Sequence, residues 1–193
     1  KALLKEVGIE SVYCEVYGNS LNKEFYADFP GTNQSNHIIL CVPQPNDSIW
    51  LECTNSQQPF NYLGQFTSDR YAVLITSEGG KLAKTPKYTT NQNTQFRKVH
   101  AILDETGNII ANVNTQYYGL QYDNISHQFL NSKEDQIKEL YQDLSLNNFT
   151  IIDVNYNQKK EEIPFAEENI SLEVKKYSFI SGKRVFIPLN MLN

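Results

Sequence analysis

Apolar and polar residues alternate along most of this chain, and that alternation predicts β-strands. Residues 10–17 read ESVYCEVY, which places Val12, Cys14 and Val16 on one face of a strand because successive side chains point to opposite faces. Similar runs predict further strands at 71–76, 81–85, 95–103, 108–118, 149–156, 170–179 and 183–188. Short stretches of turn-forming residues such as Asp-Glu-Thr-Gly separate several of them, so the pattern favours antiparallel sheets.

Two segments have helical spacing instead. Residues 1–7, KALLKEV, carry apolar side chains on a helical face, and Gly8 suits the residue after a helix end. This segment has no N-cap and no initiator Met, so we expect the chain to begin inside a helix and to be a fragment of a longer protein. Further on, Ser132 and Asp135 form a capping-box variant that predicts a helix with one apolar face: Ile137, Leu140, Tyr141 and Leu144.

The two helices and the strands together predict an α+β fold in two domains. Residues 88–94, YTTNQNT, are polar and have no periodic pattern, so we place the boundary there. The first domain covers residues 1–90 and contains a helix end and an antiparallel sheet. The second covers residues 95–193 and is mostly antiparallel, a sheet or sandwich with one helix.

A hairpin at 36–54, NHIILCVPQPNDSIWLECT, carries the most informative chemistry. If Val42 pairs with Asp47 across the turn, His37 lies opposite Glu52, with Cβ atoms close enough for a hydrogen bond. The same register sets apolar residues against each other and predicts a buried face of Ile38, Leu40, Ile49 and Leu51.

A histidine held by a carboxylate has a fixed tautomer and orientation. It supplies two of the three groups of a nucleophile–base–orienter triad, so His37 and Glu52 are candidate catalytic residues. The alternative is a structural His–Glu pair at a sheet edge.

Composition excludes several function classes. The chain has 193 residues, 40% of them hydrophobic, and a net charge of -5 without a cluster of Lys and Arg, which argues against nucleic-acid binding. No apolar run approaches the roughly 18 residues of a membrane span. Three cysteines without C-x-x-C spacing, and histidines far apart in sequence, predict neither a disulfide framework nor a metal site, and no cofactor motif is present.

Other candidate residues have a structural interpretation beside the functional one. Trp50 lines a substrate cleft beside His37 or anchors the packing of the hairpin. Arg70 is expected to pair with an acid or cap loop carbonyl groups rather than to clamp a substrate. His100 and His127 are isolated in the sequence, and we expect hydrogen-bonding roles for them. The cysteines, Cys14, Cys41 and Cys53, are expected in or near the core.

The order of helix, strand, His-bearing strand and acid-bearing strand resembles the transglutaminase-like core of the papain-type cysteine enzymes. His37 in NHIILCV matches the family histidine, and Glu52 in WLECT lies where the family usually has Asp before Thr. The stretches PFNYLGQFTSDRYAVLIT and GGKLAKTPKY look like the end of that core. The chain is most similar to bacterial transglutaminase-like proteins in which a β-rich domain follows the core.

The resemblance implies a fragment of a cysteine protease or acyltransferase that acts on amide bonds of a protein or peptide substrate, in the bacterial periplasm or cell envelope. The family nucleophile opens the helix whose end is at residues 1–7, so it belongs upstream of Lys1, with the other half of the core. The fragment alone is then expected to be inactive. Glu52 departs from the family's Asp and lengthens the orienting arm by one methylene.

Two other functions remain open. The chain could be a non-catalytic binding or assembly module whose β-rich half recognises a protein or glycan, with His37 and Glu52 as a structural pair. A metal-dependent activity would have to use His37, Glu52 and a cysteine, whose spacing is poor.

Overall fold

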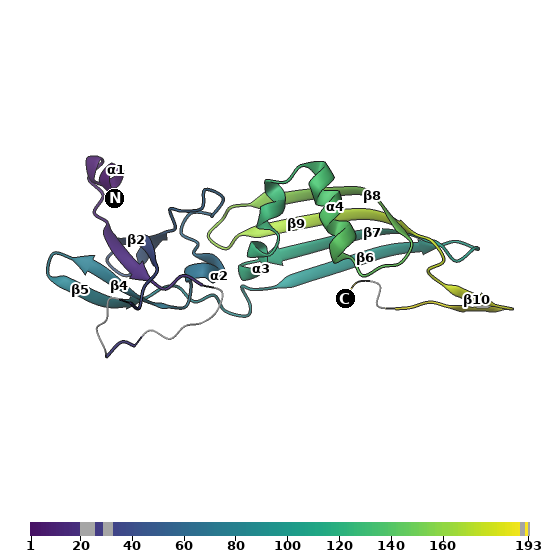
Figure 1. The fold of residues 1–193 in the computed structure, drawn as a ribbon, viewed down its shortest axis with the longest axis horizontal. Helices are drawn as coiled ribbons and strands as arrows, with labels where there is room; N and C mark the ends of the chain where they lie inside the picture. Colours follow the sequence, from purple (N-terminus) through teal and green to yellow (C-terminus); the bar gives the residue numbers. More distant parts are fainter. Residues whose placement is uncertain (20–25, 29–32, 190–191, 193) are drawn as a thin grey trace. The chain divides into compact units, whose positions relative to one another are not determined.

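A computed structural model describes residues 1–19, 26–28, 33–189 and 192. The chain forms two compact units (Figure 1). The first contains residues 1–94, and the second contains most of the chain from Gln95 onward. Two short segments of the second half, 118–123 and 159–164, belong to the first unit. Apart from these two segments, the boundary between the units lies between residues 94 and 95. The identities expected for the two domains remain predictions.

A five-stranded antiparallel sheet forms the first unit, with strand order β3-β2-β1-β4-β5. The strands are β1 (Val12–Val16), β2 (His37–Pro43), β3 (Ser48–Leu51), β4 (Tyr71–Thr76) and β5 (Gly79–Lys84). The helices of this unit are α1 (Ala2–Glu6), α2 (Gly64–Thr67) and α3 (Leu120–Asp123). The strands lie where the alternating pattern predicts them.

Helix α1 ends as the sequence predicts. Gly8 has φ of +75°, a conformation that glycine adopts without steric cost. The Ile9 N–H donates to Leu4 O at 2.9 Å and the Gly8 N–H donates to Lys5 O at 3.0 Å, which are the two hydrogen bonds of a Schellman motif. The described side chains of α1 are not buried.

The core of the first unit lies on one face of its sheet. It combines residues of four strands with Leu63: Cys14, Val16, Ile39, Cys41, Trp50 and Ala72 are buried there. Of the predicted buried face, only Leu40 is buried; Ile49 and Leu51 are half-buried, and Ile38 is 45% exposed, so the main core lies on the opposite face from the one predicted. The hydrophobic pattern could not decide between the faces, because β2 is apolar on both.

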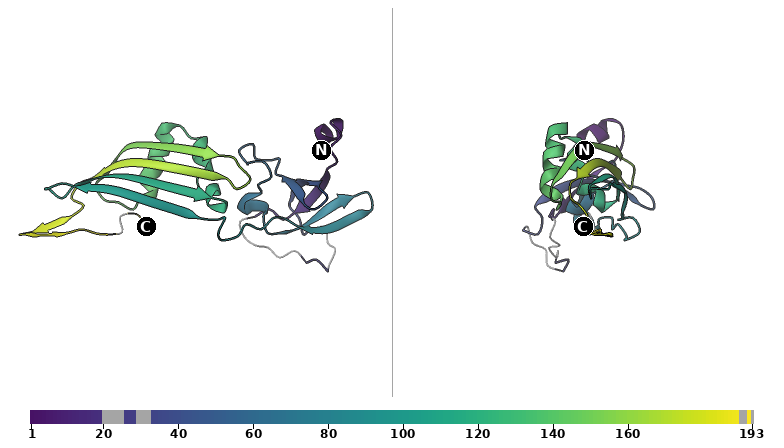
Figure 2. Two further views of the ribbon diagram at one scale, coloured as in Figure 1. Left: turned by 180° about the vertical axis from the view of Figure 1, so that it is seen from behind. Right: turned by 90° about the vertical axis from the view of Figure 1, so that its right-hand side faces the viewer.

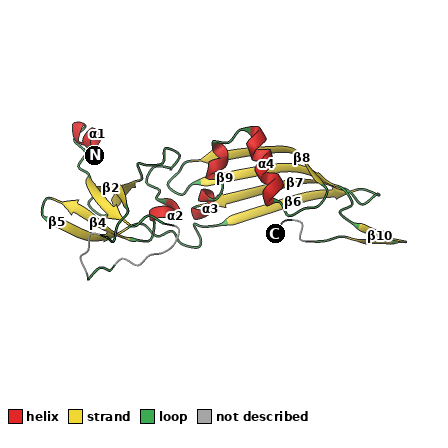
Figure 3. Cartoon of the chain, viewed as in Figure 1, coloured by secondary structure: helices red, strands yellow, loops and turns green. Residues whose placement is uncertain are grey.

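The second unit is a four-stranded sheet in the order β6-β7-β9-β8 (Figure 3). Its strands are β6 (Gln95–Leu103), β7 (Ile109–Tyr118), β8 (Phe149–Lys159) and β9 (Phe165–Val174). A small hairpin follows, made of β10 (Phe179–Ser181) and β11 (Arg184–Phe186). The sequence predicted either a sheet or a sandwich for this half of the chain, and the described strands form a single four-stranded sheet with a separate hairpin.

Helix α4 (Lys133–Asp143) and the 3-10 helix η1 (Ser126–Phe129) lie on one face of this sheet (Figures 1 and 2). The predicted cap is confirmed, because Ser132 accepts the Asp135 N–H. Buried aliphatic residues from β7, β8, β9 and α4 form the core between them: Ile109, Ala111, Val113, Leu140, Ile151, Val154, Ile170, Leu172 and Val174.

Strand β9 begins earlier than predicted. We expected residues 170–179, but the strand is Phe165–Val174. The sequence hides its first half because Glu167 and Glu168 are consecutive acids, which are depleted in strands. In the structure Glu168 is buried and accepts a hydrogen bond from the Tyr117 hydroxyl at 3.2 Å. Burial raises the pKa of Glu168, and the hydrogen bond from Tyr117 opposes that effect.

The architecture is therefore α+β and rich in antiparallel strands, as predicted. Among the described residues, no helix is long and apolar enough to cross a membrane.

Gly119 offers a direct test of the packing in the first unit. Its φ is +56°, and a Cβ there would collide with the carbonyl oxygen of Gln92. We expect Gly119→Ala to lower the free energy of unfolding by about 3 kcal/mol, since a backbone clash adds to the left-handed penalty of about 1–2 kcal/mol. Gly182 has φ of +61° and nothing within 4 Å of an added Cβ, so Gly182→Ala should show only that penalty. The free energy of unfolding of each variant is measured by urea denaturation. If Gly119→Ala and Gly182→Ala lower it equally, the Gln92 carbonyl moves away from the added Cβ at no cost.

Candidate functional site

The His37 and Glu52 side chains meet, although the hairpin register differs from the predicted one. Val42 pairs with Ile49 rather than with Asp47, and Pro43 pairs with Ser48. Pro43 is thus the last residue of β2 and not part of the turn, which moves the register by two residues. A shift of two keeps every side chain on its face, so the predicted pair survives.

The contact between the two side chains is a hydrogen bond of ordinary length. His37 Nε2 lies 2.9 Å from Glu52 Oε2. The side chains are 14% and 4% exposed, so the carboxylate is almost completely removed from water. Glu52 follows the end of β3, and its other oxygen, Oε1, accepts from the Thr54 N–H at 3.0 Å and the Thr54 hydroxyl at 2.7 Å. Both carboxylate oxygens are therefore satisfied, which fixes the orientation of Glu52.

Phe66 of α2 packs beside the imidazole. The ring centroids of His37 and Phe66 are 5.0 Å apart at an interplanar angle of 74°. Phe66 also packs against Gly18, where a Cβ would lie 2.5 Å from Cζ of the ring. The Asn36 side chain accepts from the Gly18 N–H and donates to the Gly18 carbonyl, which holds this segment beside β2. The imidazole is thus held on three sides by Glu52, Phe66 and its own strand.

Trp50 shares a strand face with Glu52 but lies in the core. Its side chain belongs to the buried cluster of the first unit and the residue is 5% exposed. Its backbone N–H donates to Asn61 Oδ1 at 2.9 Å. This burial favours the anchoring role over the cleft role.

The three cysteines are free and differ in exposure. Cys14 and Cys41 are buried in the core, as predicted, whereas Cys53 is exposed, so its expected core position is wrong. A hydrogen bond from the Cys14 thiol lowers the pKa of Cys41 to about 7, and the same interaction together with burial raises the pKa of Cys14. Neither buried thiol forms a hydrogen bond with His37 in the described part of the chain.

Arg70 caps loop carbonyl groups, as the sequence predicts. The residue is buried, and its guanidinium donates to Asn19 O and, at 3.1 Å, to Gln65 O. These contacts hold the loop at Asn19 to helix α2, so Arg70 is a structural residue here.

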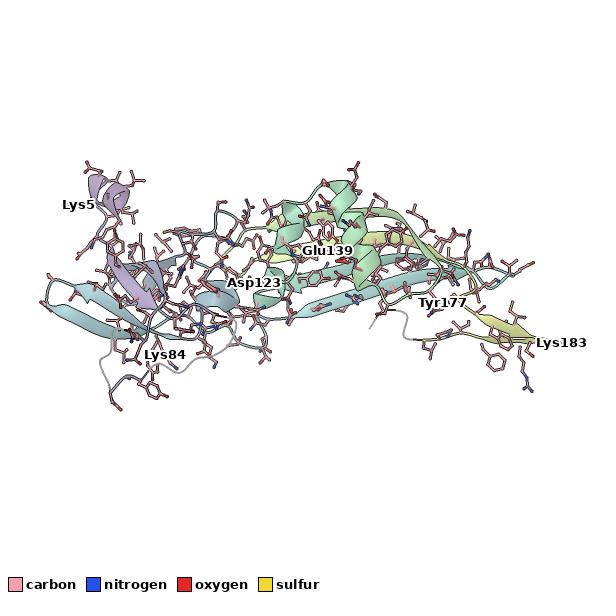
Figure 4. The ribbon with its side chains drawn as sticks, viewed as in Figure 1. Lys5, Lys84, Asp123, Glu139, Tyr177 and Lys183 are labelled. Carbon is pink, nitrogen blue, oxygen red and sulfur yellow. The ribbon has the colours of Figure 1, made fainter. Side chains whose placement is uncertain are left out.

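A second His–carboxylate pair, which the sequence did not suggest, occurs in the second unit. His127 Nε2 of η1 lies 2.5 Å from Glu139 Oε1 of α4, and Asn131 donates to the other oxygen of Glu139 (Figure 4). The hydrogen-bonding role expected for His127 is confirmed, but its partner was not predicted. The partners are 12 residues apart on different elements, so no local spacing could indicate the pair. Both side chains are substantially exposed, at 47% and 30%, unlike His37 and Glu52. His100 lies on β6 and is exposed.

No group of three or more His, Cys, Asp or Glu side chains that could hold a metal ion occurs within the described residues. Comparisons with protein-family models, with curated proteins and with solved structures gave no match. The site is therefore interpreted from its own geometry and from the sequence resemblance.

Proposed function

We propose that His37 and Glu52 are the base and the orienting carboxylate of a thiol acyl-transfer site. The parent protein would be a transglutaminase-like cysteine protease or acyltransferase. The observation that carries this proposal is the 2.9 Å bond between His37 Nε2 and a carboxylate that is 4% exposed and held by Thr54.

The bond to Glu52 defines what the other ring nitrogen can do. A carboxylate only accepts hydrogen bonds, so Nε2 carries the proton and Nδ1 of the neutral ring has the lone pair. Nδ1 makes no hydrogen bond among the described residues. It is therefore available to take a proton from a thiol, while Glu52 stabilises the imidazolium that results.

The reaction follows from these roles. A cysteine thiol passes its proton to His37 Nδ1, and its sulfur attacks the carbonyl carbon of an amide substrate. His37 returns the proton to the leaving amine as the C–N bond breaks, which leaves a thioester. Water or a second amine then attacks the thioester, with His37 again as base, and the thiol is regenerated.

The nucleophile in this proposal lies upstream of Lys1, as the family resemblance implies, because neither buried cysteine is placed for the role. Cys41 is four residues from His37 along β2, roughly 13 Å at about 3.3 Å per residue. A protein or peptide substrate and an envelope location belong to the same proposal. The one-methylene extension of Glu52 relative to Asp is compatible with it, since the longer arm reaches the imidazole.

The test is cysteine labelling in a chain extended upstream of Lys1, measured by mass spectrometry with iodoacetamide at neutral pH. We expect an upstream cysteine to react fastest and His37→Ala to slow it about 10-fold or more, because a thiol without the imidazole returns to its ordinary pKa of about 8.5 and is then only about 3% thiolate at pH 7. Glu52→Gln should slow it less. His127→Ala is the matched control because it removes the other His–carboxylate pair.

Two outcomes contradict the proposal. In one, no upstream cysteine reacts faster than the exposed Cys53. In the other, labelling of Cys14 or Cys41 is the His37-dependent reaction. A second readout, the tautomer of His37 from long-range ¹H–¹⁵N correlation spectra of the 193-residue chain, should show the neutral ring protonated at Nε2. Protonation at Nδ1 would mean that Glu52 does not orient the ring.

A further inference from the structure

The second unit has an open polar sheet face. Helices α4 and η1 cover one face of the sheet, and the other faces the viewer in the left panel of Figure 2. Along β7 and β9 buried residues alternate with more exposed ones. Most of the more exposed positions carry amides, carboxylates or a hydroxyl: Asn112, Asn114 and Gln116 on β7, and Glu167, Asn169, Ser171 and Glu173 on β9. The ends of the two strands add apolar or aromatic residues: Ile110, Tyr118 and Phe165. They lie opposite the core, on the uncovered face.

Glu167 organises the amides on this face. Its Oε1 accepts from Asn114 Nδ2 at 2.8 Å and from Gln116 Nε2 at 3.4 Å. Asn114 Nδ2 also donates to Asn169 Oδ1 at 2.8 Å. The Asn114 amide and the other amide donors lower the pKa of Glu167, so the carboxylate is ionised at neutral pH.

The carboxylate also fixes which way the amides point. Glu167 can only accept hydrogen bonds, so the NH₂ group of Asn114 must point toward β9. There it donates to both Glu167 and Asn169. Its carbonyl oxygen makes no hydrogen bond among the described residues and is left as an acceptor. Asn112 has the opposite polarity, since its Oδ1 accepts from the Ser171 hydroxyl at 2.6 Å and leaves the NH₂ as a donor. Two neighbouring positions of β7 thus offer an acceptor and a donor.

An exposed aromatic ring lies at one end of this row of amides, opposite Gln116. Phe96 of β6 pairs with Gln116 of β7, so both side chains are on the open face. Phe96 is 61% exposed. A pyranose ring has apolar C–H faces and a rim of hydroxyls that donate and accept. On an oligosaccharide, the C–H face of one sugar unit fits Phe96, while hydroxyls of the following units fit the carbonyl of Asn114 and the amide of Asn112, which lie two and four residues from Gln116 along β7.

The charges on the face argue for an uncharged ligand. Lys98 pairs with Asn114 across β6 and β7, so a lysine shares the face with the carboxylates of Glu167 and Glu173. A phosphate backbone needs a cluster of cations, which this face lacks. The exposed apolar side chains of β6 and β7 lie at opposite ends of this face: Phe96 pairs with Gln116 at one end, and Ile102 pairs with Ile110 at the other. Polar pairs lie between them, Lys98 with Asn114 and His100 with Asn112, so the face has no apolar centre of the kind that a stable protein interface needs. We propose that this face of the second unit binds an uncharged oligosaccharide.

The test is a titration of the ¹⁵N-labelled 193-residue chain, followed through backbone and side-chain amide signals. The probes are five hexasaccharides: cellohexaose, maltohexaose, xylohexaose, mannohexaose and chitohexaose, each to about 5 mM. We expect at least one to bind with Kd of about 0.1–1 mM, about −4 to −5.5 kcal/mol. The shifts should include the side-chain amides of Asn112, Asn114 and Gln116.

Variants separate binding at this face from other effects. Phe96→Ala and Asn114→Ala should each weaken binding at least tenfold. Phe96 is exposed, so its variant should keep the fold even if the Asn114 variant does not. Gln142 of α4 is an exposed amide away from this face, and Gln142→Ala should bind as well as the parent chain. Absence of shifts on this face with all five probes would overturn the proposal. So would binding that Phe96→Ala leaves unchanged. Neither result bears on the His37 site, which is in the other unit.

Discussion

Replacing Trp50 with Ala is expected to lower the free energy of unfolding of the first unit by about 3–5 kcal/mol, the usual cost of truncating a buried aromatic side chain. Trp50 is 5% exposed and packs in the cluster that contains Cys14, Cys41 and Leu63. Its removal exposes these neighbours to a cavity that β2 and β3 can only partly close. A loss of this size is a large part of the stability of a small domain.

The measurement is urea denaturation followed by far-UV circular dichroism, because Trp50 is the only tryptophan and its fluorescence disappears in the variant. Trp50→Phe keeps an aromatic ring in the cavity and should cost less than half as much. The two roles considered for Trp50 predict different results. A cost below about 1 kcal/mol would contradict the anchoring role, and Trp50 would then have to be examined as a residue that contacts substrate.

The His37–Glu52 pair could be predicted from the sequence because strand periodicity is insensitive to even register shifts. The predicted register was wrong by two residues, since Pro43 was assigned to the turn rather than to the end of β2. His37 and Glu52 stayed on the same face of the hairpin despite the shift. The long, flexible side chain of Glu52 spans the two-residue displacement and still reaches His37. What the pattern could not supply was which face of β2 is buried, because apolar residues occupy both.

Features that depend on contacts between distant segments could not be predicted. The first half of β9 looks unlike a strand because Glu167 and Glu168 are charged. Their partners are Asn114 and Tyr117, more than 50 residues earlier in the chain. His127 and Glu139 meet only because η1 packs beside α4. The spacing of residues within a short segment cannot predict contacts between distant segments. The Ser132 cap involves residues only three apart, and it was predicted correctly.

Asp123 shows how a segment from the second half of the sequence is held in the first unit. Its Oδ1 accepts from the Tyr62 hydroxyl at 2.9 Å, and its Oδ2 accepts from the Gln65 N–H at 2.6 Å (Figure 4). Tyr62 is completely buried and also donates toward Gly119 O at 3.0 Å. Burial raises the pKa of Asp123, and the hydrogen bonds from Gln65 and Tyr62 partly oppose that rise.

Asp123→Ala should therefore lower the free energy of unfolding by about 3–4 kcal/mol at neutral pH. The variant removes two charge-assisted hydrogen bonds and leaves the Tyr62 hydroxyl and the Gln65 N–H to find other partners, each at a cost of about 1–3 kcal/mol. Relief of the desolvated charge offsets part of this loss. Asp123→Asn keeps the shape and one acceptor, so it should cost less.

The pH dependence distinguishes the charge of Asp123 from its packing. A carboxyl whose pKa is raised in the folded state contributes most stability below its unfolded pKa of about 3.9, and that contribution is lost as the pH rises through the folded value. The cost of Asp123→Asn, which abolishes this titration, should accordingly be smaller at pH 7 than at pH 3.

Tyr62→Phe should show the opposite slope, since the hydroxyl stabilises the ionised carboxylate and its loss raises the pKa of Asp123 further. The cost of Tyr62→Phe should be greater at pH 7 than at pH 3. Both slopes can be measured from urea denaturation at a series of pH values. If the two variants instead show the same slope, Tyr62 does not act through the charge of Asp123. The segment 118–123 would then be held by apolar packing of Tyr122 and Tyr62, whose rings are 6.4 Å apart.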